Sequence, residues 1–315
     1  VGVILGTGVG GIQTLEEQHG VFSTRGQRRV SPFFVPRMIA NIAAGNLAIK
    51  FGFQGPNHTV ISACASGTDA IGCAARTIQY GDADVMITGG SEASITGLTI
   101  SGFANIKALS TRNDKPESAS RPFDLGRDGF VLGEGSASII LEEEEHAISR
   151  GATILGELAG YGATDDAYHL TQPVEGGKGA IRAMRNAVND AGLKLEDVDY
   201  INAHGTSTPV GDVKELGAIK EVFGDGAIPL VGSTKSLSGH ALGAAGVNES
   251  IYSLLMLQND FVTESVNIEN LDDEATGVPI VRETKKVQLN RILSNSFGFG
   301  GTNACLVFEK FNESN

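Results

Sequence analysis

Residues 59–67 read TVISACASG, an apolar run that gives way at Cys64 to small residues. This pattern predicts a strand over 58–63 that passes directly into a helix over 65–80. A thiol at a helix N-terminus faces unpaired backbone N–H groups and the positive end of the helix dipole, which lower its pKa. The position of Cys64 therefore suggests a nucleophile, although a single cysteine at a strand end is more often a small buried apolar residue.

Strand and helix patterns alternate along the rest of the chain. In its first part, the pattern predicts strands over 1–5, 84–89 and 136–142 and a helix over 39–50. Further on, it predicts strands over 153–161, 198–203, 291–296 and 303–309, with helices over 178–191, 212–223 and 242–258. The acidic run Glu142–Glu145 predicts the beginning of a solvated helix, where negative charge is favourable. The alternation indicates an α/β protein.

Composition limits the classes of function. The 315 residues are 41% hydrophobic and 19% charged, with a formal net charge of −13, which argues against wholesale binding to nucleic acid or to an anionic membrane. No apolar run reaches the roughly 18 residues needed to cross a bilayer. The three cysteines lack metal-ligand spacing, so we expect no metal site and a reducing, cytoplasmic setting. Arg25, Arg28 and Arg29 form a basic cluster that either receives an acidic partner or is a solvated turn.

Residues 6–11 read GTGVGG and match the glycine pattern of a dinucleotide-binding turn. Such a unit needs an acidic residue at the end of a second strand about 20 positions later, and the chain there reads GQRRVS over 26–31. We therefore reject a nucleotide site. The glycines are expected to let the backbone pass close to a neighbouring element or to an acyl substrate.

Two distant histidines strengthen the case for a nucleophilic Cys64. His204 lies in NAHGTST over 202–208, and His240 ends STKSLSGH over 233–240. A lone histidine is more often structural, but two in glycine-rich turns, together with a cysteine, indicate acyl transfer. Their ring N–H groups can donate to a thioester carbonyl as it becomes an enolate. Backbone amides of Cys64 and of the glycine-rich run 295–303 can supply an oxyanion hole.

Four segments resemble those of the elongating β-ketoacyl-[acyl-carrier-protein] synthases and occur in the same order: SACASG at 62–67, AHGTSTP at 203–209, KSLSGH at 235–240 and NSFGFGGTN at 295–303. The resemblance covers nearly the whole chain. It implies a homodimer and a thiolase-like fold, in which two related βαβαβαββ halves, over 1–150 and 151–315, pack as five layers, α-β-α-β-α. About a hundred residues that carry the family's first strand are absent, so we expect a fragment whose first half lacks its N-terminal elements.

The resemblance also implies the catalytic residues. Cys64 matches the acyl-accepting cysteine, and His204 and His240 match the pair that promotes malonyl decarboxylation and stabilises the carbanion. Lys235 matches the family's active-site lysine. Glu249 fits the position of the glutamate that pairs with this lysine, since a buried lysine without a partner carries a heavy desolvation cost.

Substrate contacts are implied in the same way. Phe299 matches the gate beside the nucleophile, and Thr206 and Thr208 match the threonines that hydrogen-bond the phosphopantetheine arm. Val9 and Phe34 would line the acyl pocket. The positions at which the family docks its acidic carrier protein are occupied here by Arg28, Arg29 and Lys107.

The implied activity is a decarboxylative condensation in fatty acid synthesis. An acyl group moves to Cys64, malonyl-[acyl-carrier-protein] loses CO₂, and a β-ketoacyl product two carbons longer is released, with no metal or redox cofactor. A polyketide ketosynthase and a non-catalytic chain-length subunit are the alternatives, and the latter class lacks the nucleophile. A degradative thiolase would need a second catalytic cysteine, whereas Cys73 and Cys305 are interpreted as core residues.

Overall fold

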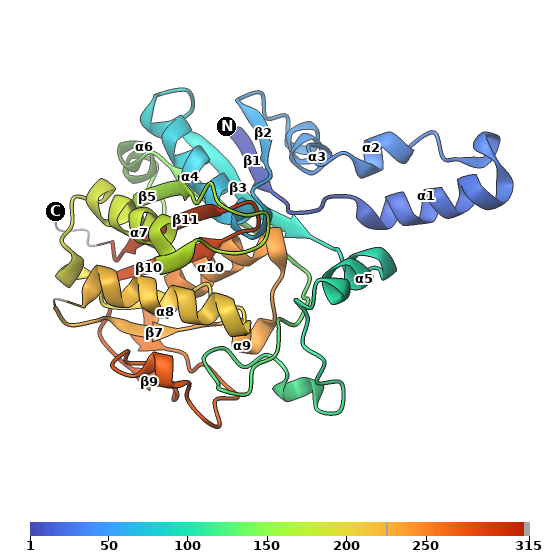
Figure 1. Ribbon diagram of the computed structural model, residues 1–315. Coiled ribbons are helices and arrows are strands. Elements are labelled where there is room, and N and C mark those ends of the chain that lie inside the picture. The colour runs from blue at the N-terminus through green and yellow to red at the C-terminus, as the bar shows by residue number, and fades with distance from the viewer. Residues whose placement is uncertain (225, 312–315) are drawn as a thin grey trace.

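The computed structural model describes residues 1–224 and 226–311 and contains two large mixed β-sheets (Figure 1). In the first sheet the strand order is β2-β1-β3-β4, where β1, β2 and β3 are parallel and β4 is antiparallel to β3. Its strands are β1 (Gly2–Gly6), β2 (Asn57–Val60), β3 (Val85–Glu92) and β4 (Gly135–Glu142).

The second sheet repeats this topology and adds one strand. Its order is β7-β6-β10-β11-β5, in which β6, β7 and β10 are parallel and β11 is antiparallel to both of its neighbours. Its strands are β5 (Glu157–Asp165), β6 (Tyr200–Asn202), β7 (Leu230–Gly232), β10 (Arg291–Phe297) and β11 (Thr302–Glu309). Within residues 1–224 and 226–311 no strand pairs with the outer edge of β4. The first sheet therefore has no counterpart of β5 in this part of the chain. A separate small sheet pairs β8 (Phe261–Val262) with β9 (Lys285–Lys286).

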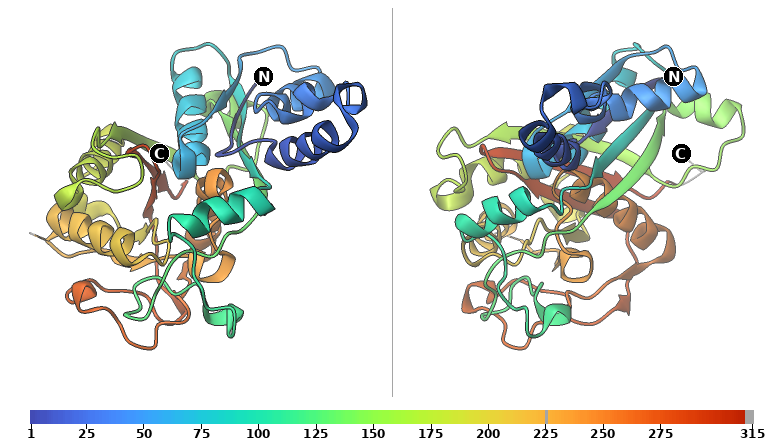
Figure 2. Two further views of the ribbon diagram at one scale, coloured as in Figure 1. Left: turned by 45° about the vertical axis from the view of Figure 1, so that its right-hand side comes forward. Right: turned by 90° about the vertical axis from the view of Figure 1, so that its right-hand side faces the viewer.

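Helices complete five layers, as the family resemblance implies (Figures 1 and 2). Between the sheets lie α4 (Ser66–Gln79) and α10 (Ala245–Asn259), and each contacts strands of both sheets. The outer face of the first sheet is covered by α3 (Ile42–Phe51). On the outer face of the second sheet α7 (Lys178–Asp190) packs against β5 and β11, with α8 (Pro209–Phe223) beside it. The result is an α-β-α-β-α arrangement.

Close packing of α7 on β5 depends on two glycines in that strand. A Cβ atom at Gly160 would lie 2.2 Å from the carbonyl oxygen of Ala187, and one at Gly162 would lie 2.2 Å from that of Ala183. Both alanines are fully buried on α7. The strand therefore gives up side chains at these positions so that the helix backbone can approach the sheet.

Most predicted elements are present, although some bounds differ and several helices were not predicted. β5 begins and ends four residues later than the predicted strand, because it continues pairing with β11 as far as Asp165. The acidic run does begin a helix, α6 (Glu144–Ser149). Sequence reasoning missed four helices. Three of them have no buried residue: α1 (Ile12–Arg25), α2 (Phe34–Met38) and α5 (Gly97–Asn105). The fourth, α9 (Lys235–Ser238), is only four residues long. Within the described part of the chain, no helix has the length and apolar character needed to span a bilayer.

Candidate active site

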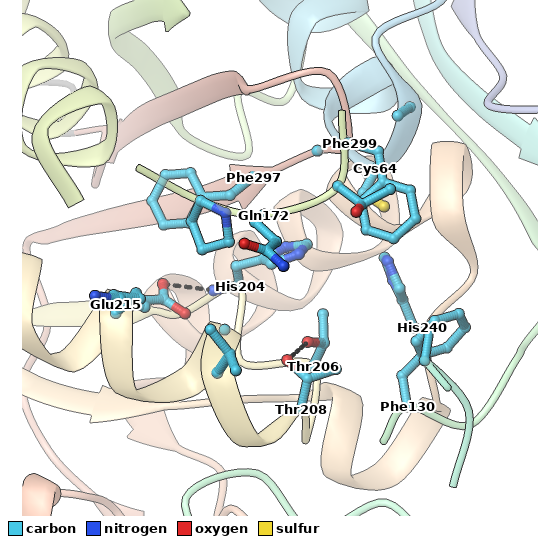
Figure 3. A pocket seen from close by; sticks show the side chains of 18 of the residues that line it. Cys64, Phe130, Gln172, His204, Thr206, Thr208, Glu215, His240, Phe297 and Phe299 are labelled. Atoms are coloured by element: carbon cyan, nitrogen blue, oxygen red, sulfur yellow. Dashed lines mark hydrogen bonds between the residues drawn. The ribbon is translucent and has the colours of Figure 1, made fainter. Parts of the chain in front are cut away.

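A cavity of about 680 Å³ lies where the two halves meet, and Cys64, His204, His240 and Phe299 line it (Figure 3). Lys235, the remaining residue predicted to be catalytic, is buried and does not line the cavity. Cys64 enters it from the junction of β2 and α4, and His204 from the loop after β6. His240 follows α9, and the loop 297–301 between β10 and β11 closes one side. Segments that are far apart in sequence thus converge on one thiol.

The backbone around Cys64 is a tight turn held by hydrogen bonds. Ala63 has a φ of +51°, a strained value for a residue with a side chain. Ser66 Oγ accepts from the amide of Ser62 at 2.9 Å and donates to the carbonyl of Ala63 at 2.7 Å. Thr302 Oγ1 donates to the carbonyl of Ser62 at 2.9 Å, which ties the turn to the second sheet. The strain is maintained by contacts from both halves.

Two backbone amides face the thiol, from Cys64 itself and from Phe299, and both favour the thiolate. A Cβ atom at Gly298 would lie 2.7 Å from the carbonyl of Ser62 and 3.1 Å from the amide of Cys64, so glycine is needed for this approach. Both N–H groups are therefore candidate donors for an oxyanion hole.

The ionisation of Cys64 differs from the sequence-based expectation. Burial raises the pKa of its thiol to about 11, even though the Lys235 cation and the Phe299 amide act in the opposite direction. The expected lowering of the pKa is therefore wrong, because desolvation outweighs the favourable dipoles at the helix N-terminus. The thiol is protonated near neutral pH and must lose its proton as it attacks.

Both histidines are neutral at physiological pH. Burial, together with the Lys235 cation, lowers the pKa of His204 and of His240 well below 6.5. Their ring centroids are 5.3 Å apart with the planes at 89°, and the ring centroids of Phe130 and His240 are 5.4 Å apart in a T-shaped arrangement. The ligand atoms of Cys64, His204 and His240 lie within 4.8 Å of one another. A neutral imidazole keeps one N–H to donate, so this cluster can hold a carbonyl oxygen beside the thiol.

A carboxylate that sequence reasoning missed supports His204. Glu215, on α8, accepts hydrogen bonds from the amides of His204 at 2.8 Å and Gly205 at 2.7 Å, and from Asn295 Nδ2 at 3.2 Å. It is buried and lines the same cavity. Its spacing from His204 carries no periodic signal, so only the folded geometry reveals the contact.

Lys235 and Glu249 form the predicted ion pair. Their side chains are 1% and 2% exposed, and Nζ contacts Oε1 directly. Burial raises the pKa of Glu249 to about 7, although the Lys235 cation opposes this shift. The pair brings a cation close to the cysteine and both histidines without leaving an uncompensated buried charge.

The predicted substrate-binding residues separate into two groups. Residues that line the cavity are Val9, Lys107, Thr206, Thr208 and Phe299. Thr206 Oγ1 and Thr208 Oγ1 lie 3.1 Å apart. The remaining three do not line it. Phe34 is the first residue of α2, and Arg28 and Arg29 lie between α1 and α2, which project from the body of the molecule (Figure 1).

Two family models match the chain in succession. The β-ketoacyl synthase N-terminal domain matches residues 1–147, and the β-ketoacyl synthase C-terminal domain matches residues 155–269. The chain belongs to the β-ketoacyl synthase family. Cys64 lies in the region matched by the N-terminal model, and His204 and His240 lie in the region matched by the C-terminal model.

Curated relatives and solved structures agree with this family. The chain is 49% identical over 311 residues to the 3-oxoacyl-[acyl-carrier-protein] synthase 2 of Coxiella burnetii, covering 98% of this chain and 75% of the relative. It is 50% identical over 312 residues to the protein of that name from Synechocystis, covering 99% and 75%.

Two solved structures share the fold. One is a type II polyketide acyl-carrier protein in complex with its ketosynthase bound to the hexaketide. Its TM-score is 0.95 at 34% identity, and the match covers 99% of this chain and 78% of that one. The other is a β-ketoacyl synthase from Burkholderia phymatum. Its TM-score is 0.92 at 36% identity, and the match covers 99% of this chain and 75% of that one.

Proposed function

We propose that this chain catalyses the decarboxylative condensation of an acyl group held on Cys64 with malonyl-[acyl-carrier-protein]. The observation that carries the proposal is the convergence of the Cys64 thiol with two neutral imidazoles, His204 and His240, inside one cavity. Nearly half of all residues are identical to those of relatives named 3-oxoacyl-[acyl-carrier-protein] synthase 2, which supports the same reaction here.

In the first half-reaction the thiol attacks an acyl thioester. Cys64 Sγ forms a bond to the carbonyl carbon and loses its proton, and the thiol of the carrier's phosphopantetheine leaves. The amides of Cys64 and Phe299 stabilise the oxyanion that forms. The positive charge of Lys235 stabilises the thiolate and so offsets part of the increase in the Cys64 pKa that burial causes.

In the second half-reaction malonyl-[acyl-carrier-protein] loses CO₂. The electron pair of the broken bond becomes an enolate whose oxygen accepts hydrogen bonds from His204 and His240. The enolate carbon then attacks the acyl-cysteine, the C–S bond to Cys64 breaks, and the released thiolate takes up a proton from solvent, which regenerates the enzyme. Neutral imidazoles suit this step, because an N–H donor stabilises the enolate oxygen without protonating it. The loss of CO₂ drives bond formation, so the proposal includes no metal or redox cofactor.

An acyl carrier protein is the proposed partner. Lys107 at the cavity supplies positive charge for an acidic carrier, and Thr206 and Thr208 line the same cavity, where they can hydrogen-bond its phosphopantetheine arm. Arg28 and Arg29, between the projecting helices α1 and α2, would add positive charge to that of Lys107. Three free cysteines, Cys64, Cys73 and Cys305, support a reducing cytoplasmic setting.

We also propose a homodimer. β2 is the edge strand of the first sheet, and exposed apolar side chains surround it. Ile49 is 82% exposed, Ile61 60% and Phe51 57%, which is unusual for large apolar residues beside an open strand edge. Light scattering should give twice the 32.8 kDa mass of one chain. A monomeric mass at micromolar concentration would contradict the proposal.

The proposed reaction is tested by supplying the protein with an acyl-carrier primer and malonyl-carrier protein. Wild-type protein should form the β-ketoacyl product, and Cys64→Ala should not, while residual decarboxylation in that variant is expected. His240→Ala should suppress both decarboxylation and elongation. Cys73→Ser is the matched control, because that thiol lies outside the cavity and should leave rates unchanged. Elongation that survives in Cys64→Ala would overturn the proposal.

A further inference from the structure

Glu92 is a buried carboxylate whose hydrogen-bond partners are all neutral. It ends β3, and the residue is 2% exposed. Its oxygens accept from the amides of Gly8 at 2.6 Å, Gly243 at 3.0 Å and Val9 at 3.2 Å, and from the hydroxyl of Thr7 at 3.3 Å. Four donors converge on one side chain, and within residues 1–224 and 226–311 no ion pair to it is present.

These donors come from both halves of the molecule. Residues 7–9 follow β1 in the glycine-rich turn, whereas Gly243 lies in the short 3-10 turn Leu242–Ala244 that precedes α10. A Cβ atom at Gly243 would lie 2.2 Å from the amide nitrogen of Gly8, so the two backbones touch. The turn that resembles a dinucleotide-binding motif therefore uses its amides on the protein's own carboxylate.

The clamped segments form part of the cavity wall next to the nucleophile. Gly8, Val9 and Leu242 all line the cavity with Cys64. A Cβ atom at Gly8 would be 2.7 Å from Glu92 Oε2 and 3.5 Å from the carbonyl of Ala63, the residue before Cys64. Glu92 thus lies directly behind the wall, while the wall itself presents backbone and the apolar side chains of Val9 and Leu242.

We propose that Glu92 is a positioning residue that fixes the wall on which the acyl chain of Cys64 packs. The proposal rests on the proposed function, because that function supplies the acyl group. An ionised carboxylate only accepts hydrogen bonds and so matches the converging donors. A glutamine would turn an NH₂ group toward one set of these amides. In place of Oε2 it separates Gly8 from Gly243, and in place of Oε1 it displaces Val9.

The charge of Glu92 has a second effect that a purely structural group would lack. Glu92 raises the pKa of the Cys64 thiol. Removing the charge should lower this pKa, and moving the carboxylate without removing the charge should not. The two consequences, wall position and thiol pKa, can therefore be separated by choosing the variant.

The test measures alkylation of Cys64 by iodoacetamide and by a long-chain N-alkyl iodoacetamide, followed by peptide mass spectrometry. A misplacement of about 1 Å can slow a reaction up to roughly 100-fold. We therefore expect that in Glu92→Gln the ratio of the alkylation rate with the long-chain reagent to the rate with iodoacetamide falls about tenfold. Its alkylation profile with iodoacetamide should also move to lower pH. Glu134→Gln is the matched control, since its carboxylate accepts from the amide of Ile95 at 2.9 Å outside the cavity.

Gly8→Ala keeps the charge and pushes the carboxylate aside, and it also provides a test if Glu92→Gln does not fold. It should lose the same chain-length preference without the shift to lower pH. An unchanged preference in the folded variants, or an equal slowing with both reagents, overturns the proposal. A wild-type protein that shows the long-chain preference but never elongates a carrier-bound primer contradicts the proposed function alone.

Discussion

The buried ion pair between Lys235 and Glu249 makes the most quantitative prediction. Glu249→Gln keeps the shape of the side chain but leaves the Lys235 ammonium, 1% exposed, without its counter-charge. Breaking a buried pair in this way costs about 3–5 kcal/mol of the free energy of unfolding. At about 2 °C per kcal/mol for a large domain, the melting temperature should fall by about 6–10 °C.

Circular dichroism during heating at about pH 8, above the Glu249 pKa of about 7, measures this change, with Glu309→Gln as the matched control. Glu309 pairs with Arg291 at 2.6 Å, but the two side chains are 25% and 28% exposed. Such a pair contributes only about 0.2–1 kcal/mol. The double variant Lys235→Met/Glu249→Leu should regain most of the stability while elongation stays lost. If Glu249→Gln melts no lower than Glu309→Gln, the account of the pair is wrong.

Three further predictions follow from the geometry. Because the pKa of Cys64 is about 11, its alkylation by iodoacetamide should keep accelerating above pH 9, and Lys235→Met should move this profile higher; a plateau below pH 9 would contradict it. Glu215→Gln should slow malonyl decarboxylation about tenfold by releasing His204, and an unchanged rate would remove Glu215 from that role. Gly162→Ala should cost about 1–3 kcal/mol on denaturant unfolding. The control Gly20→Ala, with open space around its Cβ position, should be neutral or slightly stabilising.

The sequence predicted those parts of the molecule that carry a local pattern. The apolar run before Cys64 and the small residues after it specify a strand and a helix, and both are present. The histidine segments, read as motifs, identified side chains that the structure does bring together. The five-layer arrangement followed from the family resemblance, since periodicity alone indicated only an α/β class.

The missed features depend on contacts between distant residues. Glu92 joins partners 84 and 151 residues away, so nothing in its neighbourhood marks it as important. The helix α1 has no buried residue, so it lacks the apolar stripe that predicts an amphipathic helix. The pKa of Cys64 was predicted in the wrong direction because the sequence shows a helix N-terminus but not the depth of burial.

The most direct test of the central claim is to trap and map the acyl-enzyme. The protein is incubated with acyl-carrier primer alone, digested and examined by mass spectrometry, and malonyl-carrier protein is then added to a parallel sample. The account predicts one acyl group on the peptide that contains Cys64, and its disappearance as the β-ketoacyl product and CO₂ form in equal amounts. An acyl group on another residue, or product formation that never passes through acylated Cys64, would contradict it.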